Sequence, residues 1–109
     1  MVIKETLIRE IVRRIVSVTQ PERIILFGSA STGQMTKDSD IDLLVIDRSP
    51  HDNHDERLRI RQALGDLDHS FDIIVMPAER FEESKNVIGG IAYPAHKYGR
   101  VLYEIPGRG

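Results

Sequence analysis

The sequence predicts an α/β fold, in which a small mixed β-sheet carries helices packed against it. Short apolar runs typical of buried strands occupy residues 24–27, 41–46 and 71–76. Segments with apolar residues at helical spacing precede the first run and separate the second from the third. The chain has 109 residues, 40% of them apolar, which suffices for one modest core. We therefore expect a single domain over residues 1–109.

The N-terminal segment predicts an amphipathic helix followed by a strand. Charged side chains separate the apolar ones, and the helix should end near Gln20, because Pro21 cannot continue it. The next apolar run, Ile24–Phe27, is stopped by Gly28 and reads as a buried strand. The apolar face of the helix consists of Ile3, Leu7, Ile8, Ile11, Val12, Ile15 and Val16.

A second strand, a second helix and a third strand follow. Ile41–Ile46 is the second buried run, and Phe71–Met76 is the third, stopped by Pro77. Between them, Asp52 or Asn53 provides a helix cap. The apolar face of this second helix comprises Ile60, Ala63, Leu64 and Leu67.

The C-terminal quarter predicts weaker elements. A short helical stretch lies around Ala78–Lys85. The segment with Gly89, Gly90 and Pro94 is typical of a distorted helix. Apolar residues then alternate in a pattern that predicts a last, half-exposed strand. Its alternating residues are Val101, Tyr103 and Ile105.

Composition excludes several classes of protein. Fifteen basic and 17 acidic side chains leave a net charge of −2, so no global basic field favours nucleic acid. Zero cysteines exclude a disulfide framework, a thiolate zinc site and a cysteine nucleophile, and they fit a reducing cytoplasm. No segment resembles a signal peptide or a membrane span. We expect a cytoplasmic protein that does not associate with a membrane.

Charge is unevenly distributed along the chain, and the most acidic segment contains the candidate metal-binding carboxylates. Residues 37–56 hold seven acidic and two basic side chains, net −5. Within them, Asp40 and Asp42 stand at the start of the second strand, where residues two apart project from the same face. Two adjacent carboxylates raise each other's pKa unless a cation lies between them. Hard oxygen ligands suit Mg²⁺ or Mn²⁺.

A third carboxylate and a small-residue turn complete the pattern. Asp72 begins the third strand, so it reaches Asp40 and Asp42 if the second and third strands are parallel. The Gly28-Ser29 turn reaches the same end if the first strand is antiparallel to the second. Glycine allows close backbone approach, and a helix opening at Ser29 would present N–H groups and a hydroxyl to phosphate. Phosphates beside three carboxylates indicate two-metal phosphoryl or nucleotidyl transfer. The alternative is an ordinary turn with strand-capping acids.

The pattern Gly28-Ser29, ten residues, Asp40-x-Asp42 and a later Asp72 resembles the minimal nucleotidyltransferases of the DNA polymerase beta superfamily. The resemblance covers nearly the whole chain. It implies a nucleotidyltransferase fold and Mg²⁺-dependent transfer of a nucleoside monophosphate, AMP from ATP, with release of pyrophosphate. Many minimal members are antitoxins that adenylylate a tyrosine of a helical HEPN-domain toxin. The resemblance assigns the β- and γ-phosphates to Gly28 and Ser29, and the two metals to the three aspartates.

The sequence departs from this family at one place. Many relatives carry an arginine just after Gly-Ser, where this chain has Ala30-Ser31-Thr32; Lys37 or a partner could supply the missing charge. A second interpretation is therefore a catalytically weak relative that neutralises its partner by masking it. A third, an antibiotic- or nucleic-acid-modifying transferase, lacks a further substrate domain and a basic surface.

Other polar and aromatic residues fit simpler roles. The run from His51 to Asp55 is typical of a solvated helix start rather than a metal cluster. The arginines of the first helix predict its solvated face, with partner docking as the alternative. The tyrosines favour packing over a base pocket or a modification site. These residues are Arg9, Arg13, Arg14, Tyr93, Tyr98 and Tyr103.

Overall fold

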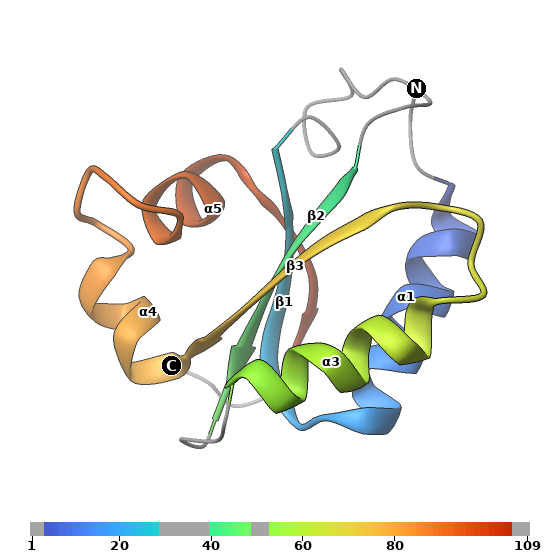
Figure 1. The fold of residues 1–109 in the computed structure, drawn as a ribbon. Helices are drawn as coiled ribbons and strands as arrows, with labels where there is room; N and C mark the ends of the chain where they lie inside the picture. Colours follow the sequence, from blue (N-terminus) through green and yellow to red (C-terminus); the bar gives the residue numbers. More distant parts are fainter. Residues whose placement is uncertain (1–3, 29–39, 49–52, 106–109) are drawn as a thin grey trace.

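The structure, a computed structural model, describes residues 4–28, 40–48 and 53–105. They form four strands and four helices (Figure 1). In chain order these are α1 (Glu5–Val18), β1 (Pro21–Phe27), β2 (Ile41–Asp47), α3 (Asn53–Leu64), β3 (Phe71–Pro77), α4 (Ala78–Ser84), α5 (Ala92–Tyr98) and β4 (Arg100–Glu104). None of the helices in these ranges has both the length and the apolar character required to cross a bilayer.

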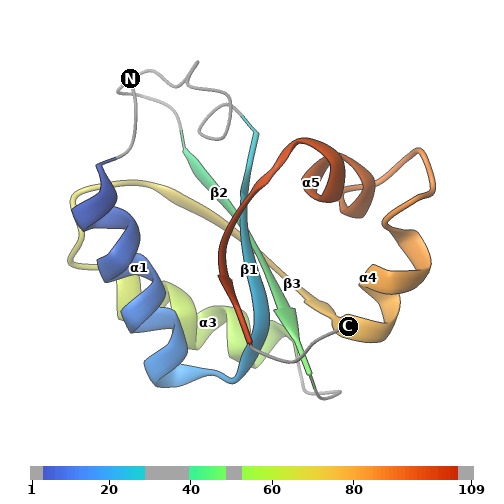
Figure 2. The same ribbon diagram turned by 180° about the vertical axis from the view of Figure 1, so that it is seen from behind.

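The four strands form one mixed sheet in the order β3-β2-β1-β4. Strands β2 and β3 are parallel, whereas β1 is antiparallel to both β2 and β4. Helices α1 and α3 cover one face of this sheet, and α4 and α5 cover the other (Figures 1 and 2). The predicted α/β fold is confirmed, and so are the parallel and antiparallel relations that the acidic residues required.

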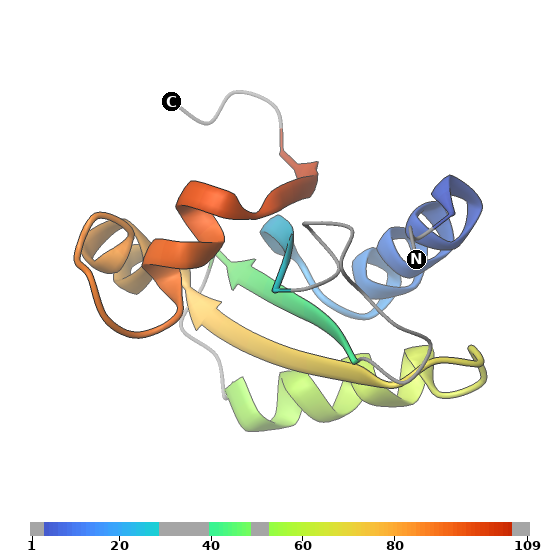
Figure 3. The same cartoon turned by 90° about the horizontal axis from the view of Figure 1, so that it is seen from above.

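Two apolar cores lie on the two faces of the sheet. On the α1/α3 face, Ile11 and Ile60 pack against Leu43 and other strand residues. On the α4/α5 face, Phe81 packs against Leu44. Because alternate strand residues point to opposite faces, β2 contributes to both cores, which explains why its sequence is almost continuously apolar. The view from above shows the sheet between the two pairs of helices (Figure 3).

The arginine-rich face of α1 divides into solvated and structural parts. Arg9 and Arg13 are exposed, as the amphipathic pattern predicts. Arg14 instead donates to the backbone carbonyl of Ala63 and pairs with Asp66. It therefore ties α1 to the end of α3, a role that the sequence pattern did not distinguish.

Three elements differ from the sequence-based expectation. Strand β1 begins at Pro21, three residues earlier than predicted, because a proline is tolerated at the first position of a strand. The expected distorted helix is a glycine turn followed by α5, since Gly89 and Gly90 both have positive φ. Strand β4 contains a register shift opposite Ile24 and Ile25, so its side chains do not alternate regularly.

A buried pair of carboxyl groups lies at the C-terminal end of β2, far from Asp40 and Asp42 at its start. Asp47 and Glu56 are each only 1% exposed. Burial, together with the hydrogen bond and the negative charge of Asp47, raises the pKa of Glu56 from 4.5 to about 8. The raised pKa favours the protonated form of Glu56, which can donate a hydrogen bond to Asp47. This pair joins the start of α3 to the end of β2.

Replacing Glu56 with glutamine should stabilise the protein at alkaline pH. Glu56 ionises in the unfolded chain at its ordinary pKa but only near pH 8 in the folded protein, so its contribution to stability is lost as the pH rises between these values. Glutamine remains neutral and its amide still donates to Asp47. We expect Glu56→Gln to raise the free energy of unfolding at pH 8 by about 2 kcal/mol and to flatten its pH dependence. Urea titrations at pH 5 and pH 8 measure both effects, with exposed Glu79→Gln as the matched control.

Candidate active site

The predicted acidic residues meet at one edge of the sheet. Asp42 is the register partner of Asp72 on the parallel strand β3 and of Phe27 on the antiparallel strand β1. Adjacent strands are about 4.8 Å apart, so the two carboxylates begin from neighbouring backbone positions. Asp40 precedes β2 at the same end, and Gly28 follows β1 there. The two ends of β1 and β2 lie together at the top of Figure 1.

Strand alternation places two of the three carboxylates, Asp42 and Asp72, on one side of the sheet. In β2, Ile41 and Leu43 flank Asp42 and belong to the α1/α3 core. In β3, Phe71 and Ile73 flank Asp72 and also pack on that core. Alternate residues point to opposite faces, so Asp42 and Asp72 project toward the α4/α5 side, while Asp40 precedes β2 and lines the sheet edge beside them. Asp40 and Asp72 are exposed and Asp42 is half-buried.

Gly28 is required by the position of Asp42. A Cβ atom on Gly28 would lie 2.3 Å from Oδ2 of Asp42, a separation that real Cβ atoms do not show. Gly28 also has φ of +72°, in the left-handed region that favours glycine. The absence of a side chain therefore lets the backbone turn directly over the Asp42 carboxylate. This is the close approach that the Gly-Ser motif predicts.

The electrostatics of the site disfavour a full set of negative charges. Burial raises the pKa of Asp42, and the charges of Asp72 and Asp40 raise it further. Both neighbours are thus close enough to act on Asp42. A cation placed among the three groups would reverse this effect and favour the ionised form.

The donor set fits a hard divalent cation. Three carboxylates from Asp40, Asp42 and Asp72 supply only oxygen ligands, which suit Mg²⁺ or Mn²⁺. In the described part of the chain, no three acidic or histidine side chains are already arranged around a single metal position. The convergence of the carboxylates and the close approach at Gly28 therefore define the candidate site, and the metal assignment remains a prediction.

Several predicted residues fall outside the described ranges. These include Ser29 with its expected phosphate-binding helix start, the Ala30-Ser31-Thr32 segment and Lys37. His51 and Asp52 of the His/Asp run also fall outside them. Of the predicted phosphate-binding pair, the structure describes Gly28 alone.

The tyrosines occupy two kinds of position. Tyr103 packs against the α1/α3 core, as predicted for a packing residue. Tyr98 is 61% exposed, and the ammonium group of Lys97 lies 5.7 Å from the centre of its ring. Tyr93 accepts a hydrogen bond of 3.1 Å from Lys97. These two side chains form a rim cluster on α5 rather than part of the core.

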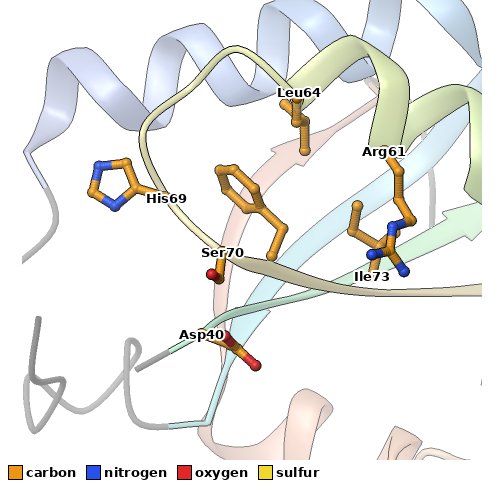
Figure 4. Close-up of a pocket in the computed structure, with 8 residues that line it drawn as sticks. Asp40, Arg61, Leu64, His69, Ser70 and Ile73 are labelled. Atoms are coloured by element: carbon orange, nitrogen blue, oxygen red, sulfur yellow. The ribbon is translucent and has the colours of Figure 1, made fainter. Parts of the chain in front are cut away.

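A pocket of about 380 Å³ adjoins the acidic edge on the α3 side of β3. Asp40, Arg61, His69 and Ser70 line it (Figure 4). Arg61 reaches from α3 toward β3, where its guanidinium group lies beside Ile73 (Figure 4). The sequence analysis did not single out Arg61. The sequence feature that could have indicated Arg61 is its place as the basic residue in the last turn of the second predicted helix.

Residues 6–95 match the family of nucleotidyltransferase domains. The match extends over most of the chain and includes all of the candidate site, so this protein belongs to the nucleotidyltransferase domain family. This confirms the class of enzyme that the Gly-Ser and Asp-x-Asp pattern predicted. No curated protein sequence matches the chain significantly.

Solved structures show the same fold. One similar chain belongs to a toxin–antitoxin crystallised with AMP-PNP, with a TM-score of 0.68 and 23% identity. Another belongs to the toxin–antitoxin MntA-HpeT, in a mutant with two aspartates replaced by glutamate, with a TM-score of 0.66 and 21% identity. Each alignment covers 91% of this chain and 74% of the other. At these identities the likeness establishes the nucleotidyltransferase fold.

Proposed function

We propose that this protein is a Mg²⁺-dependent nucleotidyltransferase that moves AMP from ATP to a hydroxyl group of a protein acceptor. The acceptor is a helical HEPN-type toxin, and the protein acts as its antitoxin. The observation that carries the proposal is the meeting of three carboxylates beside Gly28 at one sheet edge, in a chain of the nucleotidyltransferase family.

The three carboxylates and the turn take distinct roles in this reaction. Asp40, Asp42 and Asp72 would hold two Mg²⁺ ions, which would supply charge neutralisation for the phosphates. Gly28, with Ser29, binds the β- and γ-phosphates through the backbone. Asp72 orients the acceptor hydroxyl and receives its proton. The hydroxyl oxygen bonds to the α-phosphorus as the bond from that phosphorus to the pyrophosphate oxygen breaks. Positioning and charge neutralisation provide most of the rate acceleration.

Three observations favour a protein acceptor and an antitoxin role. Two of the similar solved chains come from toxin–antitoxins, one of them crystallised with AMP-PNP. In one of them, the substituted aspartates are separated by a single residue, the spacing of Asp40 and Asp42 here. The chain also carries a net charge of −2, which disfavours a nucleic-acid acceptor.

The direct test is transfer of label from ATP. Purified protein is incubated with α-labelled ATP, Mg²⁺ and the product of the adjacent gene. We expect label on that product, with mass spectrometry showing one added AMP and chelation of the metal abolishing it. Failure to transfer label with either Mg²⁺ or Mn²⁺ would contradict the proposed reaction.

The masking alternative remains because the sequence lacks an arginine just after Gly28-Ser29. Replacing all three acidic residues with alanine separates the two functions. Loss of neutralisation in Asp40→Ala/Asp42→Ala/Asp72→Ala, with partner binding retained, is expected for an enzyme. Neutralisation that survives the triple substitution would favour masking.

A further inference from the structure

The outer edge of β3 is open in the part of the chain that the structure describes. Strand β3 is the terminal strand of the sheet and pairs there with β2 alone. Ile74 and Val75 are only half-buried, whereas their register partners Leu44 and Val45 in β2 are completely buried. An edge strand of this kind presents unpaired backbone N–H and C=O groups together with apolar side chains. It can therefore accept another strand.

The opposite edge of the sheet is different. Strand β4 contains the register shift described above, which disturbs the regular spacing needed for strand addition. Its two ends carry Arg100 and Glu104, which pair with Glu5 and Arg23 at 2.7 Å. Bulges and charges are the devices by which edges resist pairing. Among the described edge strands, β3 has no register shift, and its one charged residue, Asp72, lies at the catalytic end of the strand.

Two pockets follow the open edge of β3. The pocket of about 380 Å³ lies at the catalytic end and includes Asp40 and Ile73. A second, of about 240 Å³, is lined by His54, Arg57, Ile73, Ile74 and Val75. Both pockets are lined by residues of β3 and α3 and share Ile73, and together we call them the trough. The trough starts at the strand residue next to Asp72.

The α3 rim of this trough is basic. Arg57 and Arg61 are four residues apart, so they lie on the same face of α3. Within the described residues neither forms an ion pair, in contrast to Arg59, which pairs with Asp55. Figure 4 shows Arg61 directed toward β3. Two uncompensated guanidinium groups in a protein of net charge −2 indicate a local site for carboxylates.

We propose that the β3 edge binds an extended acidic segment of the acceptor protein. The segment adds to β3 as a strand, places apolar side chains against Ile74 and Val75, and pairs its carboxylates with Arg57 and Arg61. Because side chains of an added strand alternate between the two faces, its carboxylates can face α3 while a neighbouring residue presents the acceptor hydroxyl to Asp72 on the α4/α5 side. The inference rests on the proposed transfer to a protein, because it assigns the surface on which that acceptor docks.

Binding of an acidic, tyrosine-bearing polymer tests this surface. Fluorescent poly(Glu,Tyr) is titrated with the full chain without nucleotide, and anisotropy reports binding. We expect Arg57→Glu/Arg61→Glu to weaken binding at least tenfold, because charge reversal replaces attraction by repulsion. Arg9→Glu/Arg13→Glu on α1 is the matched control, with the same spacing and charge change, and should remain within twofold. Equal weakening by both double variants would overturn the assignment, and melting temperatures verify that each variant is folded.

Amide hydrogen exchange tests the mode of binding. Strand addition should slow exchange within Phe71–Pro77 when poly(Glu,Tyr) is present. Slower exchange confined to α3 would contradict addition to β3. A single-stranded oligonucleotide at the same concentration of charge could also compete with poly(Glu,Tyr) for the wild-type protein. If it does so, and if Arg57→Glu/Arg61→Glu abolishes its binding, the trough is a nucleic-acid site and the proposal is overturned.

The transfer assay separates this inference from the proposed function. If the wild-type chain binds poly(Glu,Tyr) through Arg57 and Arg61 but transfers no label to any protein, the docking surface is supported and the reaction is contradicted. If Arg57→Glu/Arg61→Glu labels its acceptor as efficiently as the wild type at limiting acceptor concentration, the docking surface is overturned and the reaction is supported.

Discussion

Replacement of Asp42 with asparagine should abolish nucleotidyl transfer without unfolding the protein. Asp42 lies between Gly28 and Asp72 and is the most buried of the three carboxylates. Asparagine has nearly the same shape but provides one neutral oxygen ligand where a carboxylate provides two charged ones. We expect the rate of AMP transfer to fall at least about 1000-fold. The metal ions that neutralise the phosphate charge would lose a charged ligand.

The stability of the same variant should move in the opposite direction. Burial, Asp72 and Asp40 raise the pKa of Asp42, so the folded state disfavours its charge. Asparagine removes that charge, and the melting temperature should equal or exceed that of the wild type at neutral pH. This advantage should disappear in acid, where Asp42 is protonated in both states.

Exposed Asp68→Asn in the loop before β3 is the matched control for this experiment. It should retain both the transfer rate and the melting temperature. A large decrease in the melting temperature of Asp42→Asn would show instead that the acidic residues have a structural role.

Adding one methyl group at Gly28 should disable the site by displacing Asp42. The new Cβ would lie 2.3 Å from Oδ2 of Asp42, so the carboxylate must move. Because reacting groups tolerate little displacement, we expect Gly28→Ala to reduce transfer by about 100-fold or more. Positive φ adds a backbone penalty of about 1 kcal/mol. Steady-state transfer rates and urea titrations measure the two effects.

Gly90→Ala separates the steric effect from the backbone effect. Gly90 has φ of +71°, almost the value of Gly28, but a Cβ atom there would have no neighbour within 4 Å. It should therefore lose a similar amount of stability to backbone strain while transfer stays close to wild type. An equal loss of transfer in both variants would show that the steric contact with Asp42 is not responsible.

The sequence carried enough information to predict how the catalytic end is assembled. Asp40, Asp42 and Asp72 stand at the starts of apolar runs, so strand alternation alone places Asp40 and Asp42 on one side. The requirement that Gly28 and Asp72 reach them predicted one antiparallel and one parallel pairing, and the structure has both. The functional hypothesis therefore also predicted the topology.

Other features could not be predicted because they depend on contacts between distant segments. Asp47 and Glu56 appear in the sequence as members of an acidic, solvated stretch, yet packing of α3 on the sheet buries both. Arg14 appears as part of a solvated face, yet it bonds to Ala63, 49 residues away. Neither spacing nor composition reports which charged side chains acquire such neighbours.

The sequence by itself determined the class of the fold, the family and the identity of the acidic residues, because these follow from local periodicity, from a motif within residues 28–42 and from Asp72 at the start of the next apolar run. Only the tertiary structure decided that Gly28 lies against Asp42, that the described part of the chain leaves the β3 edge open beside Arg57 and Arg61, and that burial raises the pKa of Glu56. These properties arise from the distances and burial produced when separate segments pack together, and a linear pattern contains neither quantity.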